Sequence, residues 1–212
     1  MPLNMSKVNE SKEDGSQEDG LKEEGLKGDG LKEGGSKEPD SGCRNRQNIV
    51  LIGMPGCGKS TTGVLLAKTL GMSFLDTDLI LQQRESSRLQ DLVDTLGFDG
   101  FRKAEERAIL SVDVSGCVIA TGGSVVYSDA GMAHLKKNGL VLYLKVTPEE
   151  IERRITNIST RGIALHPGQT LSQLYDERSP LYEKYADIVV PVGDMTIEET
   201  VTVLALDVLK AR

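Results

Sequence analysis

The chain has 212 residues and a formal net charge of −7, with 38% hydrophobic and 27% charged residues. Since nucleic acids and anionic membranes bind basic surfaces, this charge argues against both as partners, and no apolar run has the roughly 18 residues of a membrane span. Three widely spaced cysteines argue against a disulfide framework or a zinc site, and the acidic start of the chain resembles neither a signal nor a transit peptide. We therefore expect a cytoplasmic protein that acts as a monomer on a small molecule.

Residues 1–46 differ in composition from the rest of the chain. From Ser11 a five-residue pattern recurs (SKEDG, SQEDG, LKEEG, LKGDG, LKEGG), rich in glycine and acidic residues and free of aromatic ones. Such a segment buries too little apolar surface to offset the entropy lost on ordering, so we expect a disordered acidic Gly-rich repeat tail. The tail either has no specific role or serves docking or regulation. A single kinase-like domain is expected over residues 47–212.

Short apolar runs alternate with amphipathic segments along residues 47–212. The runs predict strands at residues 48–53, 74–75, 117–121, 140–144 and 188–190. The amphipathic segments predict helices at residues 59–70, 89–96, 102–114, 129–138, 148–158, 170–185 and 197–210. Pro180 should kink or restart the helix that contains it. Strands that alternate with helices predict an α/β fold, in which a parallel sheet has helices on both faces.

The segment from Gly53 to Ser60, GMPGCGKS, matches the P-loop pattern G-x-x-x-x-G-K-[ST] between a buried strand and an amphipathic helix. Backbone amides in such a loop surround a polyphosphate, and the helix N-terminus adds partial positive charge. Lys59 is expected on the β- and γ-phosphates and Ser60 on Mg²⁺. The alternative is a Gly-rich turn without a ligand. The expected ATP contacts are Gly53, Gly56, Cys57, Gly58, Lys59, Ser60 and Thr61.

The motif Asp76-Thr77-Asp78 ends the second predicted strand. The two carboxylates at this strand end can serve different tasks. One of them can support Mg²⁺, while the other accepts a proton from an attacking hydroxyl. A strand-end turn or a helix cap explains the same motif without any catalytic role.

Two further segments offer polar groups at helix and strand positions. Arg102 and Glu105 lie three residues apart on one helical face. They form either an ordinary ion pair on the surface or part of a functional site. Residues 121–124 (TGGS) follow the third strand, as either a turn or a place where backbone amides approach a ligand.

Taken in series, the motifs GMPGCGKST, FLDTD, FRKAE, ATGGS and LYDERSPLYEKYAD resemble those of the shikimate kinase family, over nearly all of residues 47–192. The resemblance implies a P-loop fold of the nucleoside-monophosphate-kinase type, with a five-stranded parallel sheet and a mobile lid. It also implies transfer of the γ-phosphoryl group of ATP to the 3-hydroxyl of shikimate, in chorismate and aromatic amino acid biosynthesis.

The resemblance also implies roles for single residues. Asp78 would bind the acceptor hydroxyl and assist its deprotonation, and Asp76 would support Mg²⁺ together with Ser60. The guanidinium groups of Arg102 and Arg178 would hold the shikimate carboxylate, because each can form two parallel hydrogen bonds with it. Glu105 would orient Arg102. The backbone of Gly122 and Gly123 would contact the acceptor.

The chain departs from the family pattern in three places. Ser124 stands where the family usually has a third glycine. Because serine has a side chain, it fits there if its φ is negative. The lid, residues 159–168, lacks the usual R-P-L-L, but Arg161 would still contact ATP and stabilise the transferring phosphoryl group. His166 in that lid is either a solvated loop histidine or a residue with a role, as a phosphate contact or a pH sensor. The loop at residues 191–195 lacks a basic residue for the adenine.

Two other functions fit part of the pattern. A kinase for another small hydroxy acid, such as gluconate, would keep the P-loop and change the acceptor. A nucleotide-binding regulatory module without catalysis would account for the altered glycine triplet, the altered lid and the tail.

Overall fold

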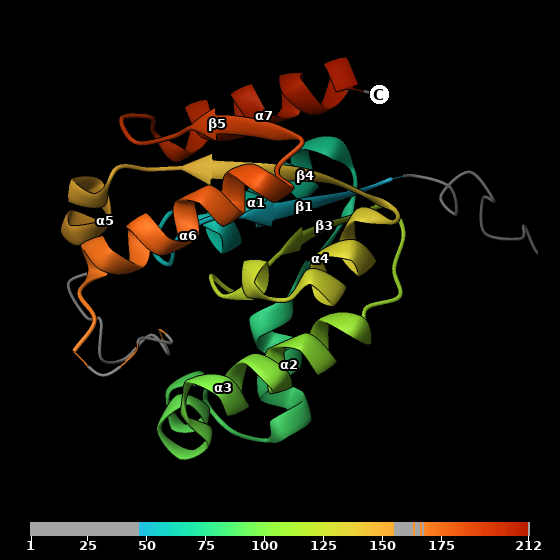
Figure 1. The fold of residues 1–212 in the computed structure, drawn as a ribbon. Helices are drawn as coiled ribbons and strands as arrows, with labels where there is room; N and C mark the ends of the chain where they lie inside the picture. The colour runs from blue at the N-terminus through green and yellow to red at the C-terminus, as the bar shows by residue number, and fades with distance from the viewer. Residues whose placement is uncertain (1–46, 155–162, 164–165, 167, 212) are drawn as a thin grey trace, which may run out of the picture. The chain divides into compact units, whose positions relative to one another are not determined.

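The computed structural model describes residues 47–154, 163, 166 and 168–211. Five strands form one sheet, all parallel, in the order β2-β3-β1-β4-β5 (Figure 1). The strands are β1 (Asn48–Ile52), β2 (Ser73–Asp76), β3 (Cys117–Ala120), β4 (Gly139–Lys145) and β5 (Ile188–Pro191). This confirms the predicted five-stranded parallel sheet. The predicted tail, residues 1–46, lies outside the described residues.

Helices connect the strands along the described chain. They are α1 (Lys59–Leu70), α2 (Thr77–Glu85), α3 (Leu89–Leu110), α4 (Asp129–Lys136), α5 (Pro148–Arg154), α6 (Leu171–Tyr185) and α7 (Ile197–Ala211), with a short 3₁₀ helix, η2 (Val125–Tyr127). Within the part of the chain that is described, no helix combines the length and apolar character needed to cross a membrane.

The core lies on both faces of the sheet. Every residue of β1 and of β3 is buried, which requires cover on both sides of these central strands. Helix α1 packs against α7, and α3 packs against α4 (Figure 1). The parallel direction of the strands brings the residues that follow β1, β2 and β3 to the same edge of the sheet. These are the P-loop, the Asp76–Asp78 motif and the Gly122–Ser124 segment.

The junction between β2 and α2 differs from the prediction. The strand does not continue through Asp78, because it ends at Asp76 and a helix that the sequence analysis missed begins at Thr77. The side chain of Asp76 caps α2, with Oδ1 accepting a 2.9 Å hydrogen bond from the amide of Asp78. The helix-cap interpretation of this motif is therefore correct for Asp76, while Asp78 lies in the first turn of the helix.

Two other helices also depart from the prediction. The separate helices expected at residues 89–96 and 102–114 run together as α3, with a break at Gly97, whose φ of 64° and ψ of −179° are not helical. Pro180 does not restart a helix, because α6 is continuous from Leu171 to Tyr185. A capping box between Thr170 and Gln173 fixes its start.

Candidate active site

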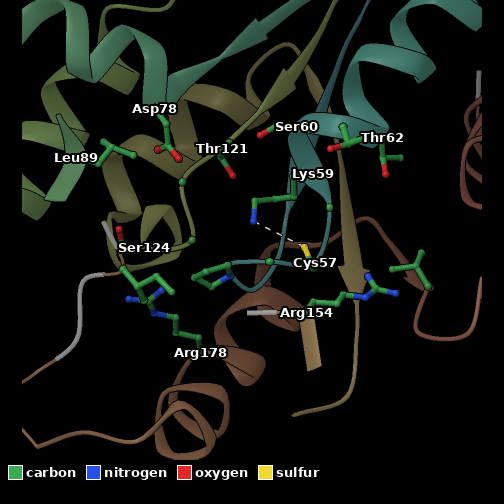
Figure 2. A pocket seen from close by; sticks show the side chains of 18 of the residues that line it. Cys57, Lys59, Ser60, Thr62, Asp78, Leu89, Thr121, Ser124, Arg154 and Arg178 are labelled. Carbon is green, nitrogen blue, oxygen red and sulfur yellow. Dashed lines mark hydrogen bonds between the residues drawn. The ribbon is translucent and has the colours of Figure 1, made fainter. Parts of the chain in front are cut away.

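A cavity of about 710 Å³ opens at the carboxyl ends of the central strands. Most of the residues expected at the site from the sequence line it, namely Gly56, Cys57, Gly58, Lys59, Ser60, Thr61, Asp78, Gly122, Gly123 and Arg178. Figure 2 shows Asp78, Ser124 and Arg178 on one side of Lys59, with Thr62 and Arg154 on the other. The cavity therefore has two ends, separated by the lysine of the P-loop.

The P-loop backbone takes a conformation that glycine permits. Gly53, Gly56 and Gly58 have φ values of 144°, 80° and 99°, a region that side chains rarely enter. Helix α1 begins directly after this loop with neither a side-chain cap nor an acidic residue in its first turn. Its N-terminal amides therefore remain suited to an anion.

The ammonium group of Lys59 lies inside the P-loop. Its Nζ donates hydrogen bonds of 2.8 and 2.9 Å to the carbonyl groups of Gly53 and Met54, and Sγ of Cys57 lies 3.7 Å away (Figure 2). Both Lys59 and Cys57 are buried. The loop therefore surrounds a positive charge at the middle of the cavity, where polyphosphate binding requires one.

Asp78 faces the cavity from the first turn of α2 (Figure 2). Burial raises the pKa of Asp78 from 3.8 to about 6, and the charge of Asp76 adds to the rise while the charge of Lys59 opposes it. A carboxylate with this pKa is largely ionised near neutral pH and is basic enough to take a proton from a hydroxyl group.

Glu105 and Asp78 both face Gly122. A β-carbon on this glycine would clash with Oε1 of Glu105 and would lie 2.7 Å from Oδ1 of Asp78. Oε1 of Glu105 is buried without a hydrogen-bond partner among the described residues. Burial raises the pKa of Glu105 from 4.5 to about 7, and the hydrogen bond from Ser124 opposes this rise. Only glycine fits between these two carboxyl groups.

Ser124 follows Gly122 and Gly123, where the family pattern has a third glycine. Its φ of −92° is negative, as a side chain at this position requires. The hydroxyl donates a 2.6 Å hydrogen bond to Oε2 of Glu105. The serine therefore fits without backbone strain and holds one oxygen of the glutamate.

The two arginines expected on the acceptor lie in adjacent cavities. Arg178 is buried and lines the large cavity. Arg102 lines a neighbouring cavity of about 350 Å³, which shares Glu105 and Ser124 with the large one. The hydrogen bond that orients Arg102 goes from Nη2 to the carbonyl of Tyr127, at 2.9 Å, rather than to Glu105. The charges of both arginines nevertheless lower the pKa of Glu105.

Three expected site residues stand apart from the large cavity. Gly53 and Asp76 do not belong to its lining, and Arg102 lines only the smaller cavity. Arg161 and most of the expected lid lie outside the described residues. In the described parts of the chain, no group of three or more His, Cys, Asp or Glu side chains is arranged to hold a metal ion.

His166 is exposed and lies outside the helices and strands, which agrees with the expected solvated loop histidine. Its ring also packs against Phe98, with the ring centroids 3.9 Å apart.

Arg154 is a lining residue that the sequence analysis missed. It ends α5 and reaches the cavity side opposite Asp78 (Figure 2). Its Nη2 donates a 2.9 Å hydrogen bond to the carbonyl of Gly193, and its Nε donates one of 2.7 Å to Glu150. The guanidinium thus lies beside the 191–195 loop, where the sequence itself offers no basic residue. The only local signal was a pair of arginines at residues 153–154, which does not reveal which one faces the cavity.

Comparisons with known proteins agree with the motifs. The family model described as shikimate kinase matches residues 55–208. A shikimate kinase of Thiobacillus denitrificans is 38% identical over 170 residues, 78% of this chain and 93% of that protein. The structure of a shikimate kinase from Acinetobacter baumannii in complex with shikimate has a TM-score of 0.73 at 27% identity, covering 82% of this chain and 99% of that one.

A fourth comparison concerns the fold alone. Thymidylate kinase from Candida albicans has a TM-score of 0.52 at 15% identity, over 79% of this chain and 92% of that one. The fold is thus that of P-loop kinases of the nucleoside-monophosphate type.

Proposed function

The chain belongs to the shikimate kinase family, and from this premise we propose that it transfers the γ-phosphoryl group of ATP to the 3-hydroxyl of shikimate. One observation carries the proposal: Asp78 and Arg178 line the same cavity as Lys59 and the P-loop. A base and a carboxylate-binding cation thus stand on the acceptor side of a phosphate-binding loop. The acceptor that fits is a small hydroxy acid.

In this proposal Asp78 positions the nucleophile. Its carboxylate accepts the hydrogen bond of the ring hydroxyl and takes the proton as the oxygen attacks the γ-phosphorus in line. The bond from the γ-phosphorus to the bridging oxygen breaks on the opposite side, and ADP leaves. Lys59 and the N-terminus of α1 stabilise negative charge on the phosphate oxygens. Catalysis is then mainly positioning together with electrostatic stabilisation, because the protein forms no covalent bond to the phosphoryl group.

The residues near the P-loop fit Mg²⁺, which prefers hard oxygen ligands and is usually held by one or two protein groups together with phosphates. Ser60 lines the cavity and offers a hydroxyl oxygen, and Asp76 stands at the start of α2 near Asp78. Ser60 would hold the ion directly, with Asp76 supporting the site. When bound, Mg²⁺ would neutralise charge on the transferring phosphoryl group.

The side of the cavity that carries Arg154 suits the base of the nucleotide. Val192, the neighbour of the Gly193 that Arg154 contacts, and Ile197 add apolar groups to the lining of this cavity, and Thr200 adds a hydroxyl. A planar guanidinium stacks on aromatic rings, and the hydrogen bond to Gly193 fixes the one in Arg154. Arg154 thereby supplies the basic group that the 191–195 loop lacks.

Arg161 keeps its proposed role on the strength of the sequence. It would add a positive charge to the transferring phosphoryl group when the lid over residues 159–168 closes and excludes water. A monomeric cytoplasmic enzyme without nucleic-acid or membrane partners belongs to the same proposal, and the net charge of −7 supports the absence of nucleic-acid and anionic-membrane partners. The sequence likewise supports a disordered tail at residues 1–46, followed by the kinase domain at 47–212.

ADP release by the full chain with MgATP tests the proposed function. We expect rapid turnover with shikimate and slow turnover without an acceptor. Faster turnover with gluconate than with shikimate would identify gluconate as the acceptor. Binding of ATP without turnover of any hydroxy acid would instead indicate a regulatory module without catalysis. Repeating the assay with residues 47–212 measures whether the first 46 residues affect the rate.

A further inference from the structure

Tyr127 contacts both arginines that are proposed to hold the acceptor carboxylate. It is the last residue of η2, three positions after Ser124. Its carbonyl accepts the 2.9 Å hydrogen bond from Nη2 of Arg102, and its hydroxyl accepts a 3.2 Å hydrogen bond from Nε of Arg178. One residue therefore joins side chains from α3 and α6, which lie far apart in the sequence.

The aromatic ring of Tyr127 adds a second kind of contact. The guanidinium carbon of Arg102 lies 4.4 Å from the ring centroid, and that of Arg178 lies 5.1 Å from it. The face of an aromatic ring attracts cations, and this attraction is stronger where water is excluded. Two guanidinium groups repel each other, so a ring that attracts both offsets part of the cost of holding them close together.

Neighbouring side chains hold the ring and the hydroxyl of Tyr127 in place. The hydroxyl donates a 2.6 Å hydrogen bond to Oε1 of Glu177, and Oε2 of Glu177 accepts a 2.7 Å hydrogen bond from Gln169. Phe98 packs edge-on against the ring, with the centroids 5.8 Å apart. Tyr127 is therefore fixed on both its polar and its apolar side, as a residue that sets the position of others needs to be.

We propose that Tyr127 is a positioning residue, which holds Arg102 and Arg178 at the spacing and orientation that bind the acceptor carboxylate. The inference rests on the proposed function, because it assigns the two arginines to that carboxylate. A carboxylate receives two guanidinium groups well only when their N–H groups point at its oxygens, and long arginine side chains lose much rotamer freedom when so held. Tyr127 fixes this geometry before the acceptor arrives.

Two substitutions separate the hydroxyl from the ring. Tyr127→Phe removes the bond to Nε of Arg178 and keeps the ring, whereas Tyr127→Leu removes both. For the full chain with shikimate we expect KM to rise about fivefold in the first variant and about 30-fold in the second. The KM for ATP should stay within about twofold of wild type in both, because neither arginine is proposed to contact the nucleotide.

Tyr185→Phe is the matched control. Tyr185 also donates a hydrogen bond to a carboxylate, that of Asp129, and lies outside the lining of both cavities. Its loss should leave both KM values unchanged. A thermal melt of each variant accompanies the kinetics, since a purely structural role for Tyr127 would lower stability and change both KM values together.

The methyl ester of shikimate provides a readout that depends on the acceptor's charge. The ester lacks the negative charge that the two arginines are proposed to bind. If Tyr127 acts through the arginines, the ratio of KM in Tyr127→Phe to KM in wild type should therefore be closer to one with the ester than with shikimate. An equal ratio for acid and ester, or an unchanged shikimate KM in Tyr127→Leu, would overturn the inference. Wild-type protein that turns over no shikimate would instead reject the proposed function, so the two failures are distinct.

Discussion

Ser124 donates a hydrogen bond of 2.6 Å to Oε2 of Glu105, and both side chains are buried. Ser124→Ala removes this donor and leaves the buried carboxyl oxygen without it, which should lower the free energy of unfolding by about 1–3 kcal/mol. Urea unfolding at pH 7 measures the change. The hydroxyl of the exposed Ser111 bonds to the carbonyl of Ala108, so Ser111→Ala should lose less than about 0.5 kcal/mol. Equal losses of unfolding free energy in the two variants would show that the buried hydrogen bond of Ser124 contributes no more than the exposed one of Ser111.

The raised pKa of Glu105 predicts a pH dependence of stability. Burial raises this pKa from 4.5 to about 7, so the folded protein binds the proton more tightly than the unfolded chain. The resulting stabilisation is complete below pH 4.5 and is lost as the pH rises through 7. In Glu105→Gln the contribution disappears, and stability should fall less between pH 5 and pH 8.5 than in wild type. Melting curves of both proteins across this pH range test the prediction. If stability depends on pH equally in Glu105→Gln and in wild type, Glu105 is not the source of the pH dependence.

Asp78→Asn tests the proposed base. The amide keeps the shape of the side chain but cannot take a proton, so kcat with shikimate should fall by about 10²–10⁴-fold. Binding of ATP, measured by calorimetry, should stay within about twofold, because Lys59 and the P-loop amides remain. A parallel loss of turnover and nucleotide binding would show that Asp78 supports the fold of the site instead.

Gly122→Ala places a methyl group between two carboxyl groups. The added carbon would clash with Oε1 of Glu105 and lie 2.7 Å from Oδ1 of Asp78, so both side chains must move. We expect kcat/KM for shikimate to fall at least about 100-fold, and unfolding to become easier by about 1–3 kcal/mol. Gly193→Ala is the stability control, because nothing lies within 4 Å of a β-carbon there. Full activity in Gly122→Ala would contradict the observed geometry.

Arg154→Ala tests the nucleotide end of the cavity. We expect the KM for ATP to rise about tenfold, with the KM for shikimate nearly unchanged. The neighbouring Arg153 is exposed and pairs with the same Glu150, so Arg153→Ala controls for the loss of a charge on α5. Similar ATP affinities in the two variants would remove Arg154 from the proposed base site.

The sequence predicted the P-loop and the sheet because both depend on local patterns. Four consecutive apolar residues before Gly53 are typical of a strand buried on both faces, and the loop motif fixes the start of α1. The motif order also indicated which strand ends meet, since parallel strands end at one edge. Most of the cavity lining follows from these two facts.

Contacts between distant segments could not be predicted in this way. Tyr127 joins α3 to α6 and Arg154 reaches the 191–195 loop, and neither residue stands in a pattern that specifies its partner. Helix α2 was missed because it follows β2 without an intervening turn residue, and its cap, Asp76, also suits a metal ligand. The direction of the Arg102 side chain decides which cavity its guanidinium lines, and residue spacing along a helix does not determine that direction.

The outermost strands of the sheet, β2 and β5, are each four residues long, and β5 ends in Pro191. A short border strand offers few unpaired backbone groups to a strand from another molecule, and a proline lacks the N–H that such pairing would need. Val189 in the edge strand β5 exposes 42% of its surface. Addition of a strand from another molecule, which would lead to fibres or aggregates at high protein concentration, is nevertheless disfavoured at these edges.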